Sequence, residues 1–188
     1  MGLFGRKPKL PPAARPALAA GERVLAWAAV GNGGSDPAPA ATDGPDAAVL
    51  VATNLGLWLP DRERLGWHDI LKAVWSGREL TVTVAETVAE RDGYQVVADG
   101  PAETYLLRDP GDLPHQVRAR VTRSVAYTQQ HAVPGGSGRI AARRVAGADG
   151  LTWTVRFDPG TPVDADEVRA ETDQLVAAAR AATAPADL

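Results

Sequence analysis

The residues best suited to acid–base chemistry in this chain are three histidines, His68, His115 and His131. Their spacing forms no metal-ligand motif, and no HExxH pattern is present. His68 precedes Asp69, and a carboxylate beside an imidazole orients the ring and raises its basicity. Adjacent residues of a strand point to opposite faces, however, so a loop histidine next to Trp67 is the favoured interpretation. A small α+β enzyme with a barrel pocket, using His68 and Asp69, is the alternative hypothesis, and we predict no other catalytic residue, no metal site and no cofactor.

A second set of candidate residues is basic and aromatic. Residues 103–144 contain seven arginines and three acids, whereas residues 158–188 contain seven acids and two arginines. The simpler interpretation is that the acidic C-terminal segment packs near the basic segment within the domain. The more specific hypothesis is that a surface formed by these basic and aromatic residues binds a protein partner or a second copy of the chain. The candidate binding residues are Arg120, Arg123, Tyr127, Trp58 and Trp67.

The composition is that of an ordinary soluble domain, with 45% hydrophobic and 23% charged residues among 188. Cysteine is absent, which excludes disulfides and thiolate metal sites. A formal net charge of -3 argues against a general nucleic-acid binder. No secretory segment is recognisable, and no apolar run approaches the roughly 20 residues that span a membrane. We therefore expect a cytoplasmic protein.

Residues 1–20 predict a flexible basic leader, because several prolines prevent a stable helix. Phe4, Arg6, Lys7 and Lys9 suggest a weak contact with an anionic membrane surface, worth about 1 kcal/mol per basic residue. A peripheral membrane adaptor is therefore a second alternative function. A solubilising leader is the simpler interpretation.

Short apolar runs separated by turn signals predict antiparallel strands over the first half of the chain. Residues 47–85 contain three such runs, and residues 21–30 form an earlier one. Residues 31–46 are rich in glycine, proline and alanine and predict a mobile loop. Two weaker strands are expected at 94–97 and 103–107.

The hydrophobic period changes to that of a helix after Arg108. Asp112 is a plausible N-cap, and Pro114 stands near the first helical position. An apolar stripe recurs at helical spacing from Val117 to Ala132. We therefore predict one helix that ends at the breaker 134–136.

A second hairpin is predicted beyond this helix, with arms at 139–145 and 151–157. The last helix is expected to start at Asp164, which forms a capping box with Glu167. Helical spacing predicts that its buried stripe consists of Val168, Thr172, Leu175, Val176 and Ala179.

This order of elements resembles the bacterial pleckstrin-homology-like (PH-like) domains over about residues 21–132. The resemblance implies a bent, partly open barrel plugged by one helix, with Val117, Val121 and Val125 inserted into it. Several relatives bind phosphoinositides beside the first strand loop, but that loop contains three acids and no basic residue here, so the lipid site is not carried over. The segments that carry the resemblance are GERVLAWA, VLVATNLGLWLP, LGWHDILKAVW and LTVTVA.

We therefore predict an α+β protein with a PH-like bent antiparallel barrel capped by one helix. Residues 1–20 are the leader, 21–133 the barrel with its helix, and 134–188 a hairpin–helix extension packed on the same domain. The expected function is that of a non-enzymatic binding or scaffold module. Its expected partner is protein, bound through a sheet edge or through the helix face with Arg120 and Arg123. Self-association through the second hairpin is a further hypothesis.

Overall fold

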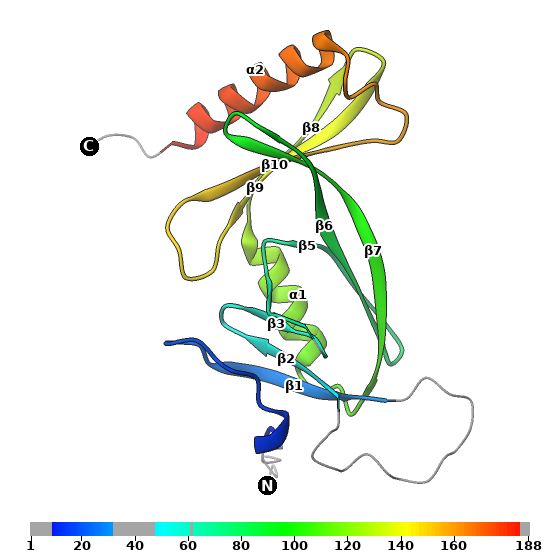
Figure 1. Ribbon diagram of the computed structural model, residues 1–188, viewed down its shortest axis with the longest axis vertical. Coiled ribbons are helices and arrows are strands. Elements are labelled where there is room, and N and C mark those ends of the chain that lie inside the picture. The colour runs from blue at the N-terminus through cyan, green and yellow to red at the C-terminus, as the bar shows by residue number, and fades with distance from the viewer. Residues whose placement is uncertain (1–8, 32–47, 61, 185–188) are drawn as a thin grey trace, which may run out of the picture.

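The computed structural model describes residues 9–31, 48–60 and 62–184, and this part of the chain is α+β (Figure 1). Residues 32–46 of the predicted loop, and Phe4, Arg6 and Lys7 of the leader, therefore lie outside the described residues. Neither α-helix of the described chain has the length and apolar character needed to traverse a bilayer. The elements are η1 (Pro12–Ala14), β1 (Val24–Val30), β2 (Val49–Thr53), β3 (Gly56–Trp58), β4 (Leu65–Gly66), β5 (Ile70–Ser76), β6 (Glu79–Arg91), β7 (Tyr94–Arg108), α1 (Leu113–Ser124), β8 (Val125–Val133), β9 (Gly136–Arg144), β10 (Leu151–Phe157) and α2 (Asp166–Thr183).

One mixed sheet connects all the strands of the described residues. Its main path runs β4-β3-β2-β1-β7-β10-β9-β8, and β6 branches from β7 with β5 at its other side. Among the strand pairs of the described chain, only β7–β10 is parallel. The sheet is not closed, since β4 and β8 end the path and β5 pairs with β6 alone. The α+β class is confirmed. The predicted bent antiparallel barrel is not formed, because the sheet is mixed and does not close.

The long hairpin of β6 and β7 is shared by two halves of the molecule (Figure 1). The end of β7 pairs with β1 at Ala29↔Arg108, whereas its start pairs with β10 at Gln95↔Thr154. We predicted two separate strands for this region because of its turn signal. Gly100 and Pro101 instead fall at a register shift between β6 and β7, and a bulge tolerates the missing N–H of proline.

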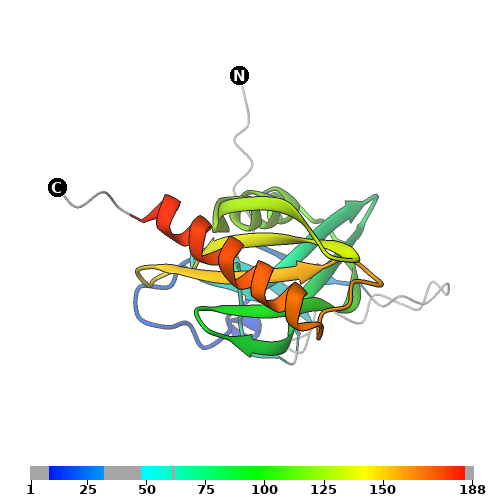
Figure 2. The same ribbon diagram turned by 90° about the horizontal axis from the view of Figure 1, so that it is seen from above.

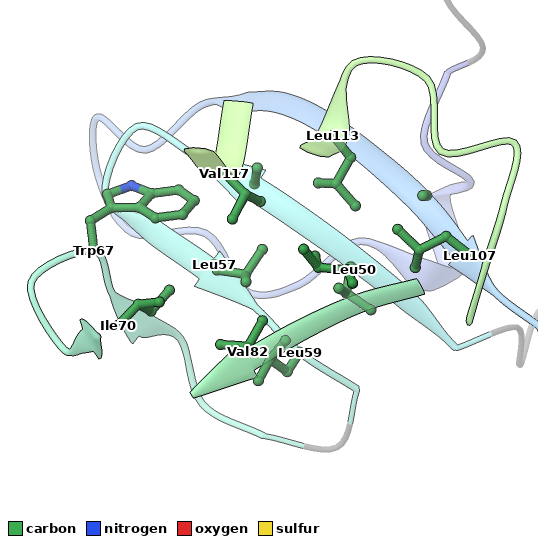
Figure 3. Close-up of a cluster of buried hydrophobic side chains, with 12 residues drawn as sticks. Leu50, Leu57, Leu59, Trp67, Ile70, Val82, Leu107, Leu113 and Val117 are labelled. Atoms are coloured by element: carbon green, nitrogen blue, oxygen red, sulfur yellow. The ribbon is translucent and has the colours of Figure 1, made fainter. Parts of the chain in front are cut away.

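The first core lies between α1 and the strands from β1 to β7, as Figure 3 shows. Val117 of α1 is fully buried there, and Val121 is partly buried against the same cluster, as expected. Val125 lies in β8 instead of the helix. The buried members of this cluster are Ala28, Leu50, Ala52, Leu57, Leu59, Trp67, Ile70, Leu80, Val82, Leu107, Leu113 and Val117.

The second core lies between α2 and one face of the β8–β9–β10 layer (Figure 2). Val168, Thr172, Val176 and Ala179 form the buried stripe of α2, as the helical spacing predicted. Side chains alternate between the faces of a strand, so Ile140 and Ala142 face α2 and the arginines beside them on β9 face away from it. The acidic helix therefore packs on the apolar face of strands that belong to the basic segment, and Arg139 and Arg143 lie on the opposite face of β9.

The predicted helix ends earlier than expected, because α1 stops at Ser124 and residues 125–133 form β8. The side chain of Arg144 on the neighbouring strand donates to the carbonyl oxygens of Arg123 and Val125 at 3.3 Å each. These bonds satisfy carbonyl groups that the helix end leaves unpaired. Pairing with β9 thus overrides the helical spacing of this stretch.

The start of α2 also differs from the prediction. Its N-cap is Ala165, and the cap position makes no side-chain hydrogen bond, so the capping box of Asp164 and Glu167 is not formed. Asp166 and Glu167 lie in the first turn, where negative charge interacts favourably with the helix dipole.

A buried carboxylate, Glu22, joins the segment before β1 to β2 and β3. It accepts hydrogen bonds from Thr53 Oγ1 at 2.6 Å, Trp58 Nε1 at 2.9 Å and the Ala19 amide at 2.9 Å. It also pairs with Arg64 at 2.7 Å. Burial by itself would raise the pKa of Glu22, but the hydrogen bonds and the Arg64 charge outweigh it and hold the pKa below its ordinary value.

We expect Glu22→Gln to lower the free energy of unfolding at pH 7 by about 1–3 kcal/mol, because four donors, the Arg64 guanidinium among them, lose a charged acceptor. A lowered folded-state pKa means that ionised Glu22 stabilises the fold above the unfolded value of about 4.3, and that this stability is lost as the pH falls through the folded pKa. The variant should therefore show a shallower loss of stability between about pH 5 and pH 3 in urea titrations. Glu63→Gln, at an exposed position, is the control, and equal slopes in all three proteins would contradict the role of Glu22.

Candidate binding surface

The two predicted tryptophan anchors are held inside the molecule. Trp67 is 2% exposed, and its Nε1 donates to the Thr53 carbonyl at 3.2 Å. Trp58 is half-buried, its Nε1 donates to Glu22, and the Arg64 guanidinium lies 6.0 Å from its ring centre. Trp67 is therefore unavailable as an interface anchor in this structure, and Trp58 is engaged in the Glu22 network.

Arg120 and Arg123 lie on α1, close to a third arginine, Arg23. Burial lowers the pKa of Arg120, and the positive charges of Arg123 and Arg23 lower it further. Such a group of like charges favours an acidic neighbour over a neutral one.

Tyr127, predicted on the same helix, belongs to β8. Its ring lies 5.6 Å from that of Trp153, and its hydroxyl donates to the Gln129 side chain. Trp153 belongs to the core under α2, so Tyr127 faces that helix. The predicted helix face and Tyr127 are thus separate features.

His68 and Asp69 do approach each other, with 3.4 Å between His68 Nε2 and Asp69 Oδ1. The ring lies against Gly66, where an added Cβ would be 2.4 Å from His68 Cε1, so a larger residue there would displace the ring. His68 Nδ1 is buried and has no hydrogen-bond partner in the described part of the chain. His68 lines none of the five cavities that we describe there. The pair is therefore a local contact, and the enzyme hypothesis stays a prediction.

No group of three or more histidine, aspartate or glutamate side chains suited to a metal ion occurs among residues 9–31, 48–60 and 62–184. Of the leader residues considered for membrane contact, Phe4, Arg6 and Lys7 lie outside these ranges. Lys9 is exposed.

One strand edge that is free in the described chain belongs to β8; β5, which pairs only with β6, has another. Within these residues β8 pairs only with β9, in antiparallel register from Val125↔Arg143 to Val133↔Gly136. Thr128, Gln129 and Gln130, at the middle of the strand, are all exposed. Sequence reasoning missed this edge because it assigned the stretch to a helix, although its β-branched and aromatic residues were a signal for a strand.

The hydrogen-bonding direction of each β8 residue follows from the turn that joins it to β9. A two-residue turn, Pro134-Gly135 with φ +73 at the glycine, closes the hairpin at the pair Val133/Gly136. Hydrogen-bonded and non-hydrogen-bonded pairs alternate from there along an antiparallel ladder. Gln130 and Thr128 consequently fall at positions whose N–H and C=O groups point away from β9.

The predicted second hairpin, β9 and β10, is formed as expected. Both of its strands are internal, however, because β9 also pairs with β8 and β10 also pairs with β7. Edge-to-edge self-association through this hairpin would have to displace an existing strand. On this side of the sheet, the free edge of the described chain lies one strand further out, at β8.

His131 is the one buried histidine of the described residues, at 6% exposure, and it stands on β8. Neither ring nitrogen has a hydrogen-bond partner there, and the ring makes an edge contact with Phe157, with 6.2 Å between centres. Burial lowers the pKa of His131, although Glu171 and Asp158 act in the opposite direction.

This burial predicts acid sensitivity. A folded-state pKa below the unfolded value of about 6.5 means that the unfolded chain binds the proton more readily, so stability falls as the pH drops through about 6.5. We expect His131→Phe to lose less stability than the parent between about pH 7.5 and pH 5 in urea titrations. His115→Gln, at an exposed position, should behave as the parent. An unchanged pH dependence in the Phe variant would contradict the burial of a neutral His131.

Comparison with known protein families, with characterised proteins and with solved structures finds no match for this chain.

Proposed function

We propose that this protein is a non-enzymatic binding module whose β8 edge accepts an extended segment of a protein partner. The observation that carries the proposal is the outer edge of β8, which no other strand of the described chain occupies. An extended peptide that adds to such an edge gains main-chain hydrogen bonds, and neighbouring side chains select its sequence. A nine-residue strand is long enough to form several residue pairs with a partner segment and so to fix its register.

The composition of β8 is that of an edge able to pair with a partner strand, and it lacks the residues that usually prevent such pairing. Proteins usually block exposed edges with lysine, proline or inward charges. Residues 125–133 contain no charged side chain and no proline, and the register shift near Val125 is confined to one end.

The basic end of β8 defines the partner further. Arg123 is exposed two residues before the strand, and Arg144 reaches the carbonyl groups at the junction. Arg120 lies one turn earlier on α1. We expect the partner segment to carry acidic residues at the end that pairs near Val125.

We also propose that β1 to β7 and α1 are an open form of the PH-like arrangement. The support is the order of seven strands followed by one helix, with Leu113 and Val117 buried against the strands. In this proposal the extension from β8 to α2 supplies the binding edge.

A proline at position 130 tests the edge. Gln130 directs its N–H outward, so Gln130→Pro removes a donor to the partner and no bond to β9. Gln130→Ala is the matched control, because it keeps the N–H and removes only the side chain. We expect peptides enriched from a displayed library of random peptides to bind the Pro variant at least about tenfold more weakly than the Ala variant, as measured by fluorescence polarisation.

Two further results decide the interpretation. Circular dichroism must show the same fold for both variants, and Thr128→Pro, at the equivalent position two residues earlier, repeats the test if the first variant unfolds. Equal peptide affinity in the Pro and Ala variants, or no enrichment of any peptide, would contradict strand addition at β8. Anionic-vesicle pelleting as the sole activity would favour the membrane adaptor instead.

A further inference from the structure

A cleft of about 330 Å³ lies on the opposite side of the β9–β10 layer from α2. Five strands contribute to it, namely β5, β7, β8, β9 and β10. Its volume is at the lower end of the range for small-ligand pockets. The lining residues are Leu71, Lys72, Val97, Val125, Thr128, Arg139, Ala141, Arg143, Thr154 and Arg156.

Four of these lining side chains are cationic, and none is acidic. One acid outside the lining, Asp99, pairs with Lys72 at 2.7 Å and with Arg156 at 2.5 Å. A single carboxylate thus offsets two of the four cations in part, and the cleft keeps a positive excess of three. The positive electrostatic potential that this excess creates in a concave site concentrates anions.

Arg143 is the most deeply placed of these cations, at 8% exposure. Its Nη1 donates to the Ile70 carbonyl at 2.9 Å and to Ser124 Oγ at 3.2 Å, while Nε has no partner in the described residues. No carboxylate of the described chain lies within ion-pair distance of it, and Asp69 acts on it only from further away. A buried guanidinium normally has a bound anion or a paired carboxylate, since an uncompensated buried charge is unfavourable.

We propose that this cleft binds a small phosphate monoester, with its phosphoryl group against Arg143. A phosphate monoester carries close to two negative charges at neutral pH and matches the excess of positive charge better than a single carboxylate does. Arg139 and Arg156 complete the cationic rim. Leu71, Val97 and Val125 offer an apolar wall for the body of the ligand. This proposal does not depend on the β8 edge.

Arg143 also links the two halves of the molecule, because β9 belongs to one half and Ile70 to the other. A purely structural Arg143 would explain its burial without any ligand. Arg139 separates the two explanations, since it is exposed and lines the cleft without holding the halves together. Its substitution should change ligand binding and leave stability unchanged.

The test is calorimetric titration of the full chain with phenyl phosphate. Benzoate, which has the same phenyl ring but only one negative charge, is titrated for comparison. We expect saturable binding of phenyl phosphate, about tenfold weaker binding of benzoate, and weakening of both by added salt. Arg139→Gln should weaken phenyl phosphate binding by about tenfold with an unchanged unfolding midpoint. Arg169→Gln, an exposed arginine on α2 beyond the other face of the layer, is the matched control and should bind as the parent does.

A second variant and a vesicle-binding experiment complete the test. Arg143→Lys keeps the charge but not the planar fork, so it should also lose affinity; if it fails to fold, Arg139→Gln alone decides. Vesicles of phosphatidylcholine with and without phosphatidic acid test whether the monoester can be a lipid headgroup, and binding that Arg139→Gln abolishes would assign the lipid to the cleft. Absence of saturable phenyl phosphate binding, or equal binding by Arg139→Gln and Arg169→Gln, would overturn the proposal.

Discussion

The long strand β7 is the constraint on which the rest of this structure depends. One end pairs antiparallel with β1 and the other end pairs parallel with β10, so a single strand belongs to both halves of the sheet. Tyr94 and Val96 lie in the second core, and Leu107 lies in the first core. Because the register of β7 is fixed at both ends, each half positions the other. The bulge at Gly100 and Pro101 lets the strand bend between these two roles.

The two faces of the β9–β10 layer differ in character because β10 pairs with β7. Once β10 is held against β7, alternation directs Trp153 and Val155 toward α2, and the intervening Thr154 and Arg156 toward the opposite face. The helix buries the apolar face, and the cleft forms on the basic one. The proposed anion site and the second core are therefore two consequences of one strand register.

The open sheet explains why binding is the function that we propose. A closed barrel has no edges, whereas this sheet ends at β8 with a row of main-chain groups available for pairing. The same strand leads directly from α1, where Arg120 and Arg123 lie. The edge, the arginines and the cleft are thus grouped around the junction of α1, β8 and β9, while the Glu22 network joins the segment before β1 to β2 and β3.

Local patterns in the sequence were sufficient for much of the secondary structure. Alternation and turn residues located β5, β9 and β10, and helical spacing identified the buried stripe of α2 from Val168 to Ala179. These features depend on residues close in the chain, so a single sequence contains them. The sequence also showed an excess of arginine between residues 103 and 144.

Only the tertiary structure decided which elements meet. The stretch from Val125 to Val133 fits both a helical and a strand pattern, and pairing with β9 selects the strand. The burial of Trp67 in the core, the open sheet and the gathering of Arg139, Arg143 and Arg156 with Lys72 all require contacts between residues far apart in the chain. Periodicity states which side of an element is apolar, but it does not state which partner covers that side, because many pairings bury similar area. The choice among them is made by register and packing across the whole molecule.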